Sequence, residues 1–231
     1  MKNKKILIPT LVITLVSVLG IGTTLAYLTD KDDAKNTFTV GEVVIDLEEP
    51  NWDDETDGKD MVPGTTVYKD PTITCDTDSA DSYMRVKMVI KDSETDAVIT
   101  DVNRYKTILD TIKYDENGTF VEGEKYSSTE IATLPMVNTN LFTIPDEITN
   151  LGNTAPEAVY FNYKNIFVAN DSVCLFTTIL VPTDFGNAEM AALGNYYIEL
   201  SAEAIQADGF DTADEAFAAL PANVPVAARK N

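Results

Sequence analysis

The chain has 231 residues, 38 acidic against 17 basic side chains and a net charge of −21, a balance that excludes nucleic acid and anionic membrane as partners because both repel such a surface. It contains no histidine, so an HExxH zinc protease, a Ser-His-Asp triad and a Cys-His pair are all excluded. We therefore expect a protein that is not an enzyme.

The N-terminus has the pattern of a secretory signal peptide. Lys2, Lys4 and Lys5 precede residues 6–29, which carry no charge. Small side chains at Thr24 and Ala26 predict cleavage after Ala26, so that the mature chain begins at Tyr27. Removing three of the 17 basic side chains and none of the 38 acidic ones changes the net charge to −24. The alternative is an uncleaved membrane anchor, since about 20 apolar residues can span a bilayer.

The chain has two cysteines, Cys75 and Cys174. Outside the cell such a pair can form a disulfide. The alternative is a pair of free thiols, since Cys174 lies in an apolar strand pattern where a buried thiol is ordinary.

Most of the periodicity is that of β-strands. Apolar and polar side chains alternate over residues 83–91 and 198–204, which indicates strands with one wet face. Residues 173–181 are apolar on both faces and predict one central, covered strand. In residues 38–47 the alternation changes parity at Gly41, which predicts a bulge or bend. Further strands are expected at residues 65–68, 72–75 and 166–169.

Two short helices are expected among these strands. Apolar residues recur at helical spacing over residues 102–112, after Thr100 as the N-cap. Thr212 and Glu215 form a capping box for a second helix, which Pro221 ends. Residues 114–160 read as loops with one hairpin. Many short strands and few helices predict a mainly β fold, an antiparallel β-sandwich of jelly-roll type.

One acidic stretch resembles the start of a calcium-binding loop. Asp53, Glu55 and Asp57 are followed by Gly58, as in an EF-hand, but the twelfth position is Gly64 where a glutamate ligand belongs. Calcium is therefore the one cofactor that we consider, as a weak site. The alternative is an acidic turn without a metal. A second acidic cluster contains Asp76, Asp78 and Asp81.

Four segments together resemble the TasA and camelysin-like family of exported proteins, which are processed by a SipW-type signal peptidase. They are residues 22–30 (GTTLAYLTD), residues 36–47 (NTFTVGEVVIDL), the VPG and KDP motifs at residues 62–64 and 69–71, and residues 204–217. The resemblance covers both ends of the chain but not residues 92–160. Histidine is absent, so the metalloprotease activity assigned to camelysin does not transfer.

The resemblance implies a secreted, cell-surface subunit of an extracellular biofilm matrix or fibre, self-associating by strand addition. The expected parts are a signal peptide (residues 1–26), a donor segment (residues 27–40), a β-sandwich domain (residues 41–220) and a tail (residues 221–231). Phe38 and Val40 would be the apolar side chains of the donor strand. The alternative function is a monomeric, acidic surface binding module, in one form calcium-dependent.

Overall fold

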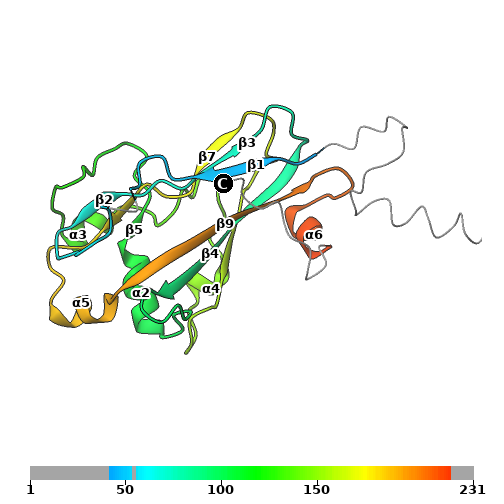
Figure 1. Cartoon of the computed structure of the whole chain (residues 1–231). Coiled ribbons are helices and arrows are strands. Elements are labelled where there is room, and N and C mark those ends of the chain that lie inside the picture. The colour runs from blue at the N-terminus through cyan, green and yellow to red at the C-terminus, as the bar shows by residue number, and fades with distance from the viewer. Residues whose placement is uncertain (1–41, 54–55, 220–231) are drawn as a thin grey trace, which may run out of the picture. The chain divides into compact units, whose positions relative to one another are not determined.

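A computed structural model describes residues 42–53 and 56–219 (Figure 1). The chain divides into two units, residues 1–40 and 41–231, and all the described residues belong to the second. That unit is mainly β and contains three small antiparallel sheets. The prediction of a mainly β, antiparallel fold is confirmed, and its finer form, a jelly-roll sandwich, stays a prediction.

The longest strands form sheet C, in the order β6-β4-β9. β4 (Ser82–Asp92) and β9 (Tyr196–Gln206) pair over their whole length, and β6 (Val159–Asn162) lies on the other side of β4. The alternation seen in the sequence becomes two faces. Met84, Val86 and Met88 are buried in the core, whereas Arg85 and Lys87 lie on the outer face.

Two smaller sheets use shorter strands. Sheet A has the order β1-β3-β7, from β1 (Ile45–Glu48), β3 (Thr72–Cys75) and β7 (Ser172–Cys174). Sheet B has the order β2-β8-β5, from β2 (Thr66–Tyr68), β8 (Thr178–Leu180) and β5 (Ile112–Lys113). The strands predicted at residues 65–68 and 72–75 are thereby confirmed.

The single strand predicted over residues 173–181 is wrong. The chain leaves sheet A after β7, crosses the core through Leu175 and Phe176, and enters sheet B as β8. The Leu175 N–H donates to Pro71 O at 3.0 Å and the Thr177 N–H to Lys113 O at 3.0 Å, so the crossing keeps its backbone hydrogen bonds. A segment that passes between two sheets is apolar on both sides, as a central strand is.

Two other strand predictions are only partly met. Of residues 38–47, the structure describes those from residue 42 onward, and the strand there is β1, which begins at Ile45. The predicted bulge at Gly41 lies outside the described residues. Residues 166–169 form no strand, because only Phe167 makes a bridge, to Ser82.

The two predicted helices exist, with different ends. α2 (Val102–Thr111) begins one residue later than expected, because Asp101 is its N-cap and accepts a 2.8 Å hydrogen bond from the Arg104 N–H. Thr212 caps α6 (Ala213–Ala218), but the Glu215 carboxylate accepts from the Asp211 N–H instead of closing the box.

Three short helices were missed. They are α3 (Ser128–Ile131), α4 (Asp146–Thr149) and α5 (Asn187–Leu193). The expectation of only two helices is therefore wrong, as is the expectation of loops with one hairpin over residues 114–160, where α3 and α4 lie. No helix within the described part of the chain is long and apolar enough to cross a membrane.

Side chains from all three sheets meet in one core. Ile73 from sheet A, Met84 from sheet C and Ile179 from sheet B belong to it, together with Tyr105 and Ile108 of α2. Each large apolar side chain that is fully buried contributes about 1.5–3 kcal/mol. This shared core positions the sheet edges and the cavity described below.

α6 packs on the outer face of sheet C. The Arg85 guanidinium lies 4.1 Å from the ring centroid of Phe217 in α6 and 4.2 Å from that of Tyr160 in β6. Its Nε also donates to the Glu203 carboxylate in β9 at 2.6 Å. One side chain thus joins the helix to all three strands of the sheet.

Candidate functional site

The acidic turn proposed as a calcium site is closed by its own hydrogen bonds. Asp57 Oδ2 accepts from the Asp53 N–H at 2.8 Å, and Asp57 Oδ1 accepts from the Thr56 hydroxyl at 3.3 Å. Glu55 lies outside the described residues. Among residues 42–53 and 56–219, no three Asp, Glu or Cys side chains are grouped to hold a metal ion. Calcium binding at Asp53, Glu55 and Asp57 stays a prediction.

Both cysteines are free thiols in the structure. Cys174 of β7 lies opposite Thr72 of β3. Thr72 is three residues from Cys75 along that strand, a distance of about 10 Å. Because side chains alternate, the Cys75 thiol faces the core and the Cys174 thiol faces the other side of sheet A. A disulfide needs Cα atoms within about 7 Å, so the structure does not bring this pair together.

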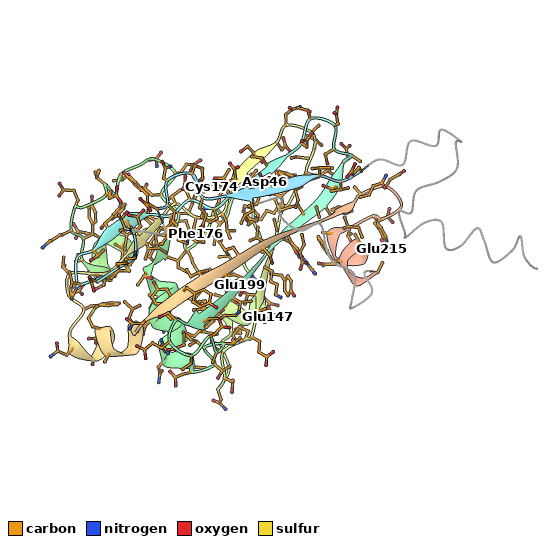
Figure 2. The ribbon with its side chains drawn as sticks, in the orientation of Figure 1. Asp46, Glu147, Cys174, Phe176, Glu199 and Glu215 are labelled. Atoms are coloured by element: carbon orange, nitrogen blue, oxygen red, sulfur yellow. The ribbon has the colours of Figure 1, made fainter. Side chains whose placement is uncertain are left out.

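The Cys174 thiol has a partner of its own. Its Sγ lies 2.9 Å from the carbonyl oxygen of Phe176, and both residues are labelled in Figure 2. Burial raises the pKa of Cys174 to about 11 and also raises the pKa of Cys75. Both thiols are therefore poor nucleophiles at neutral pH.

The residues expected to carry processing and strand donation lie outside the described residues. They are Thr24, Ala26 and Tyr27 at the cleavage site and Phe38 and Val40 in the donor segment. What the structure describes is the body of the protein, residues 42–53 and 56–219.

Two edge strands of this body lie next to each other. Among the described residues, β9 pairs only with β4, and β1 pairs only with β3. β1 and β9 are neighbours in space, and Figure 2 labels Asp46 on β1 and Glu199 on β9. The Leu47 N–H of β1 donates to Asp46 Oδ1 at 2.9 Å. One backbone donor on the free edge of β1 is therefore already satisfied.

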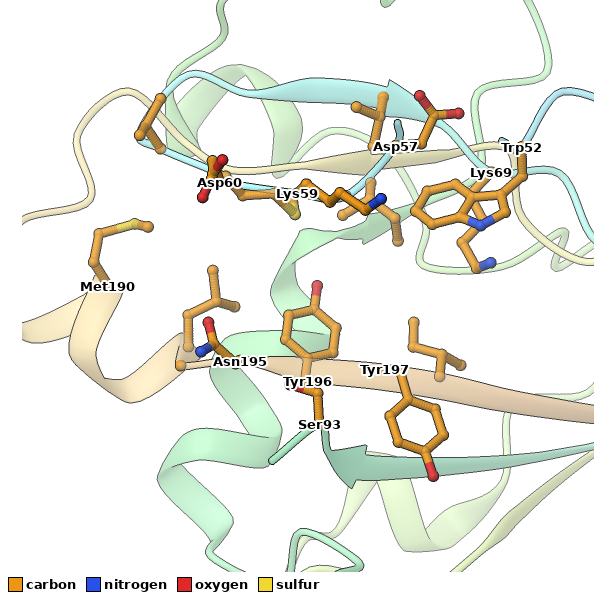
Figure 3. A pocket seen from close by; sticks show the side chains of 18 of the residues that line it. Trp52, Asp57, Lys59, Asp60, Lys69, Ser93, Met190, Asn195, Tyr196 and Tyr197 are labelled. Carbon is orange, nitrogen blue, oxygen red and sulfur yellow. The ribbon is translucent and has the colours of Figure 1, made fainter. Parts of the chain in front are cut away.

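A cavity of about 1000 Å³ opens at the start of β9 (Figure 3). We call it the slot. One wall is the loop after β1 together with β2 and β8, and the other is the end of α5 and the start of β9. Its aliphatic lining comprises Met61, Val62, Val67, Ile179, Met190, Leu193 and Ile198. Two methionines make such a wall adaptable, because the thioether chain is flexible and polarisable.

Trp52 stands at one end of the slot, above Lys69 (Figure 3). The Lys69 Nζ lies 4.0 Å from the indole ring centroid and 2.8 Å from Glu49 Oε1. Gly58 has φ +68°, and a Cβ there would lie 2.7 Å from Trp52 Cη2. The turn therefore requires glycine at this position both for its backbone and for its contact with the indole.

The rim of the slot has a net charge of −1, from three carboxylates and two ammonium groups. Asp57, Asp60 and Glu49 line it together with Lys59 and Lys69, and the Lys69–Glu49 pair neutralises itself. The slot also contains Tyr196, whose pKa is raised by burial and whose hydroxyl lies 3.4 Å from that of Thr111. A lining that combines aliphatic side chains, aromatic rings and a small excess of carboxylates suits an amphipathic ligand that carries positive charge.

The sequence did not reveal the slot. Its lining comes from separate segments, residues 49–69, 93, 179 and 190–198, and no periodic pattern connects them. The one available signal was Trp52, the only tryptophan of the chain, six residues before Gly58. Comparison with families of known proteins, with characterised proteins and with solved structures finds no match.

Proposed function

We propose that this chain is a secreted structural subunit of an extracellular matrix or cell-surface fibre, which assembles by N-terminal strand addition. A SipW-type signal peptidase would cleave after Ala26 and leave Tyr27 as the new N-terminus. Residues 27–40 would then pair with a neighbouring subunit. The observation that supports the proposal is β9, an edge strand of 11 residues that, among the described residues, pairs on one side only.

The lengths of donor and acceptor agree. β9 is about 36 Å long at about 3.3 Å per residue, and the 14 residues of the donor segment cover that length. Strand addition takes its affinity from backbone hydrogen bonds, while alternate side chains set the register. Phe38 and Val40, which are two residues apart, would face the same side of the new strand.

The jelly-roll sandwich belongs to the same proposal. Three antiparallel sheets that share one core are compatible with it. In such a sandwich the neighbouring edges of β1 and β9 would form one groove, and an added strand would close it. No catalytic step forms part of this function.

The test compares two secreted forms, one beginning at Tyr27 and the other at Gly41. We expect fibres or oligomers from the first and a folded monomer from the second, measured by light scattering and electron microscopy. Phe38→Asp/Val40→Asp should abolish assembly, since one apolar face is lost. Thr37→Asp/Thr39→Asp adds the same charge on the other face and should weaken assembly less. Monomers from both forms at all salt concentrations would contradict the proposal.

The slot favours a second candidate, a monomeric acidic surface binding module. Its rings, apolar walls and acidic rim form a cavity large enough for a ligand. Calcium dependence can be tested directly by adding Ca²⁺ and following the emission of Trp52, which lies in the slot beside the acidic turn. A saturable change that EGTA reverses would support this candidate.

A further inference from the structure

We propose that the slot binds residues 220–231 of a second copy of this chain. We call these residues, LPANVPVAARKN, the tail segment. The contact would join subunits through the tail segment and the slot, which includes the first residues of β9, and it does not use the donor segment. It therefore goes beyond the proposed function and does not require strand addition.

The interior of the slot suits the middle of the tail segment. Apolar side chains line both walls of the slot, with Trp52 at one end and Tyr196 on the wall formed by β9 (Figure 3). The tail segment contains Val224, Pro225 and Val226 in succession. Proline-containing segments dock in grooves lined by aromatic rings, because they lose little conformational entropy on binding.

The charges are complementary. Glu49, Asp57 and Asp60 at the rim outnumber Lys59 and Lys69 by one charge, and Glu49 is already paired with Lys69. The tail segment carries Arg229 and Lys230 and no acidic side chain, in a chain whose net charge is −21. An acidic rim attracts such a segment and repels most of the remaining surface of another subunit.

The position of α6 favours a neighbour's slot over the segment's own. α6 ends at Ala218, and the ring of its Phe217 lies against Arg85 on the outer face of sheet C. Tyr196 and Ile198 of the slot pair with Asp92 and Ile90 and so face the core side of the same sheet. A segment leaving α6 would have to pass round a sheet edge to reach its own slot.

Such a contact joins two different surfaces, the tail segment of one subunit and the slot of the next. A head-to-tail contact of this kind leaves a free tail segment at one end and a free slot at the other. It therefore extends into a chain unless it closes into a ring. A fibre held by β9 pairing would gain a second connection between its subunits.

Trp52 provides the readout, because it is the only tryptophan of the chain and lines the slot. The secreted chain carrying Arg229→Glu/Lys230→Glu is titrated with a synthetic peptide of residues 220–231. We expect a saturable change in Trp52 emission. Asp57→Asn/Asp60→Asn should weaken binding about three- to tenfold, as expected for two exposed ion pairs. A peptide with Val224→Asp/Val226→Asp should not bind.

Asp208→Asn/Asp211→Asn is the matched control, since both residues are exposed and neither lines the slot. It should leave the affinity unchanged. If both asparagine pairs weakened peptide binding equally, the effect would be a general attraction between opposite charges, and the proposal would be overturned. The absence of a saturable change in Trp52 emission would also overturn it. The same titration in the Phe38→Asp/Val40→Asp background should give the same affinity. Failure of strand addition can therefore be distinguished from failure of the contact between the tail segment and the slot.

Sedimentation velocity tests whether the contact is between subunits. In the Phe38→Asp/Val40→Asp background, the sedimentation coefficient should rise with protein concentration and return to the monomer value with excess peptide or with Arg229→Glu/Lys230→Glu. A chain that stays monomeric while its Trp52 no longer responds to the peptide binds its own tail segment. That result would overturn the intersubunit contact.

Discussion

Arg85 joins α6 to sheet C through a single guanidinium group, which contacts the rings of Phe217 and Tyr160 and pairs with Glu203. Arg85→Ala should lower the free energy of unfolding by about 1.5–3 kcal/mol, the sum expected for two cation–π contacts and a partly buried ion pair. Urea unfolding measures it. Lys87→Ala on the same strand face is the control, and an equal loss from both would contradict the role of Arg85.

Asp92 makes stability depend on pH. Hydrogen bonds from Arg104 and then from Thr95 lower the pKa of its carboxyl to about 2. A carboxyl with a lowered pKa in the folded state stabilises the fold above its unfolded pKa of about 4, and this stabilisation is lost as the pH falls toward 2. Urea midpoints between pH 4.5 and 2 should therefore fall less steeply in Asp92→Asn than in the natural chain. Parallel curves would contradict this.

At the scale of elements, the alternation of side chains identified the strands that have one wet face. β4 and β9 alternate because one face of sheet C packs on the core while the other meets solvent. Residues 173–181 lack alternation, and the pattern did not distinguish a covered strand from a segment that crosses between sheets A and B. Helix ends shifted where a side chain outside the pattern, Asp101, supplied the cap.

The candidate site was less accessible from the sequence than the strands were. The edge position of β9 depends on which strands pair, and pairing between residues far apart in the chain leaves no local signal. The slot depends on the meeting of a loop, two sheets and α5. The cysteine spacing likewise did not show that the two thiols face opposite sides of sheet A.

The pairing of β3 with β7 predicts how the cysteines react. Cys75 faces the core, and Cys174 is partly buried on the other face, where its thiol donates a hydrogen bond to Phe176 O. We expect no change in mass or unfolding midpoint on adding reductant, slow alkylation of the native protein at pH 8 and two alkylated thiols in urea. A chain that takes up two alkyl groups in urea only after reduction would contain the disulfide and contradict this register.

At the scale of the whole molecule, net charge opposes the association of subunits. After cleavage each would carry −24, and this repulsion extends about 10 Å at 0.1 M salt but only about 3 Å at 1 M. Strand addition relies on backbone hydrogen bonds, which salt does not screen, whereas salt does screen the repulsion between subunits. Fibre mass should therefore rise with salt. It should rise again as the pH falls toward the sequence pI of about 4.1, and then decline as the folded state loses the contribution of Asp92.

The tail segment and the slot should respond to salt in the opposite direction. Arg229 and Lys230 would be attracted by Asp57 and Asp60, and salt weakens attraction between exposed opposite charges as it weakens repulsion between like ones. We therefore expect the affinity of the peptide of residues 220–231 to fall between about 20 mM and 0.5 M NaCl, while the pelleted fraction of the chain beginning at Tyr27 rises. Pelleting and Trp52 titration on one salt series measure both. Fibre mass that falls in parallel with peptide affinity would mean that the tail segment carries the assembly and that β9 does not.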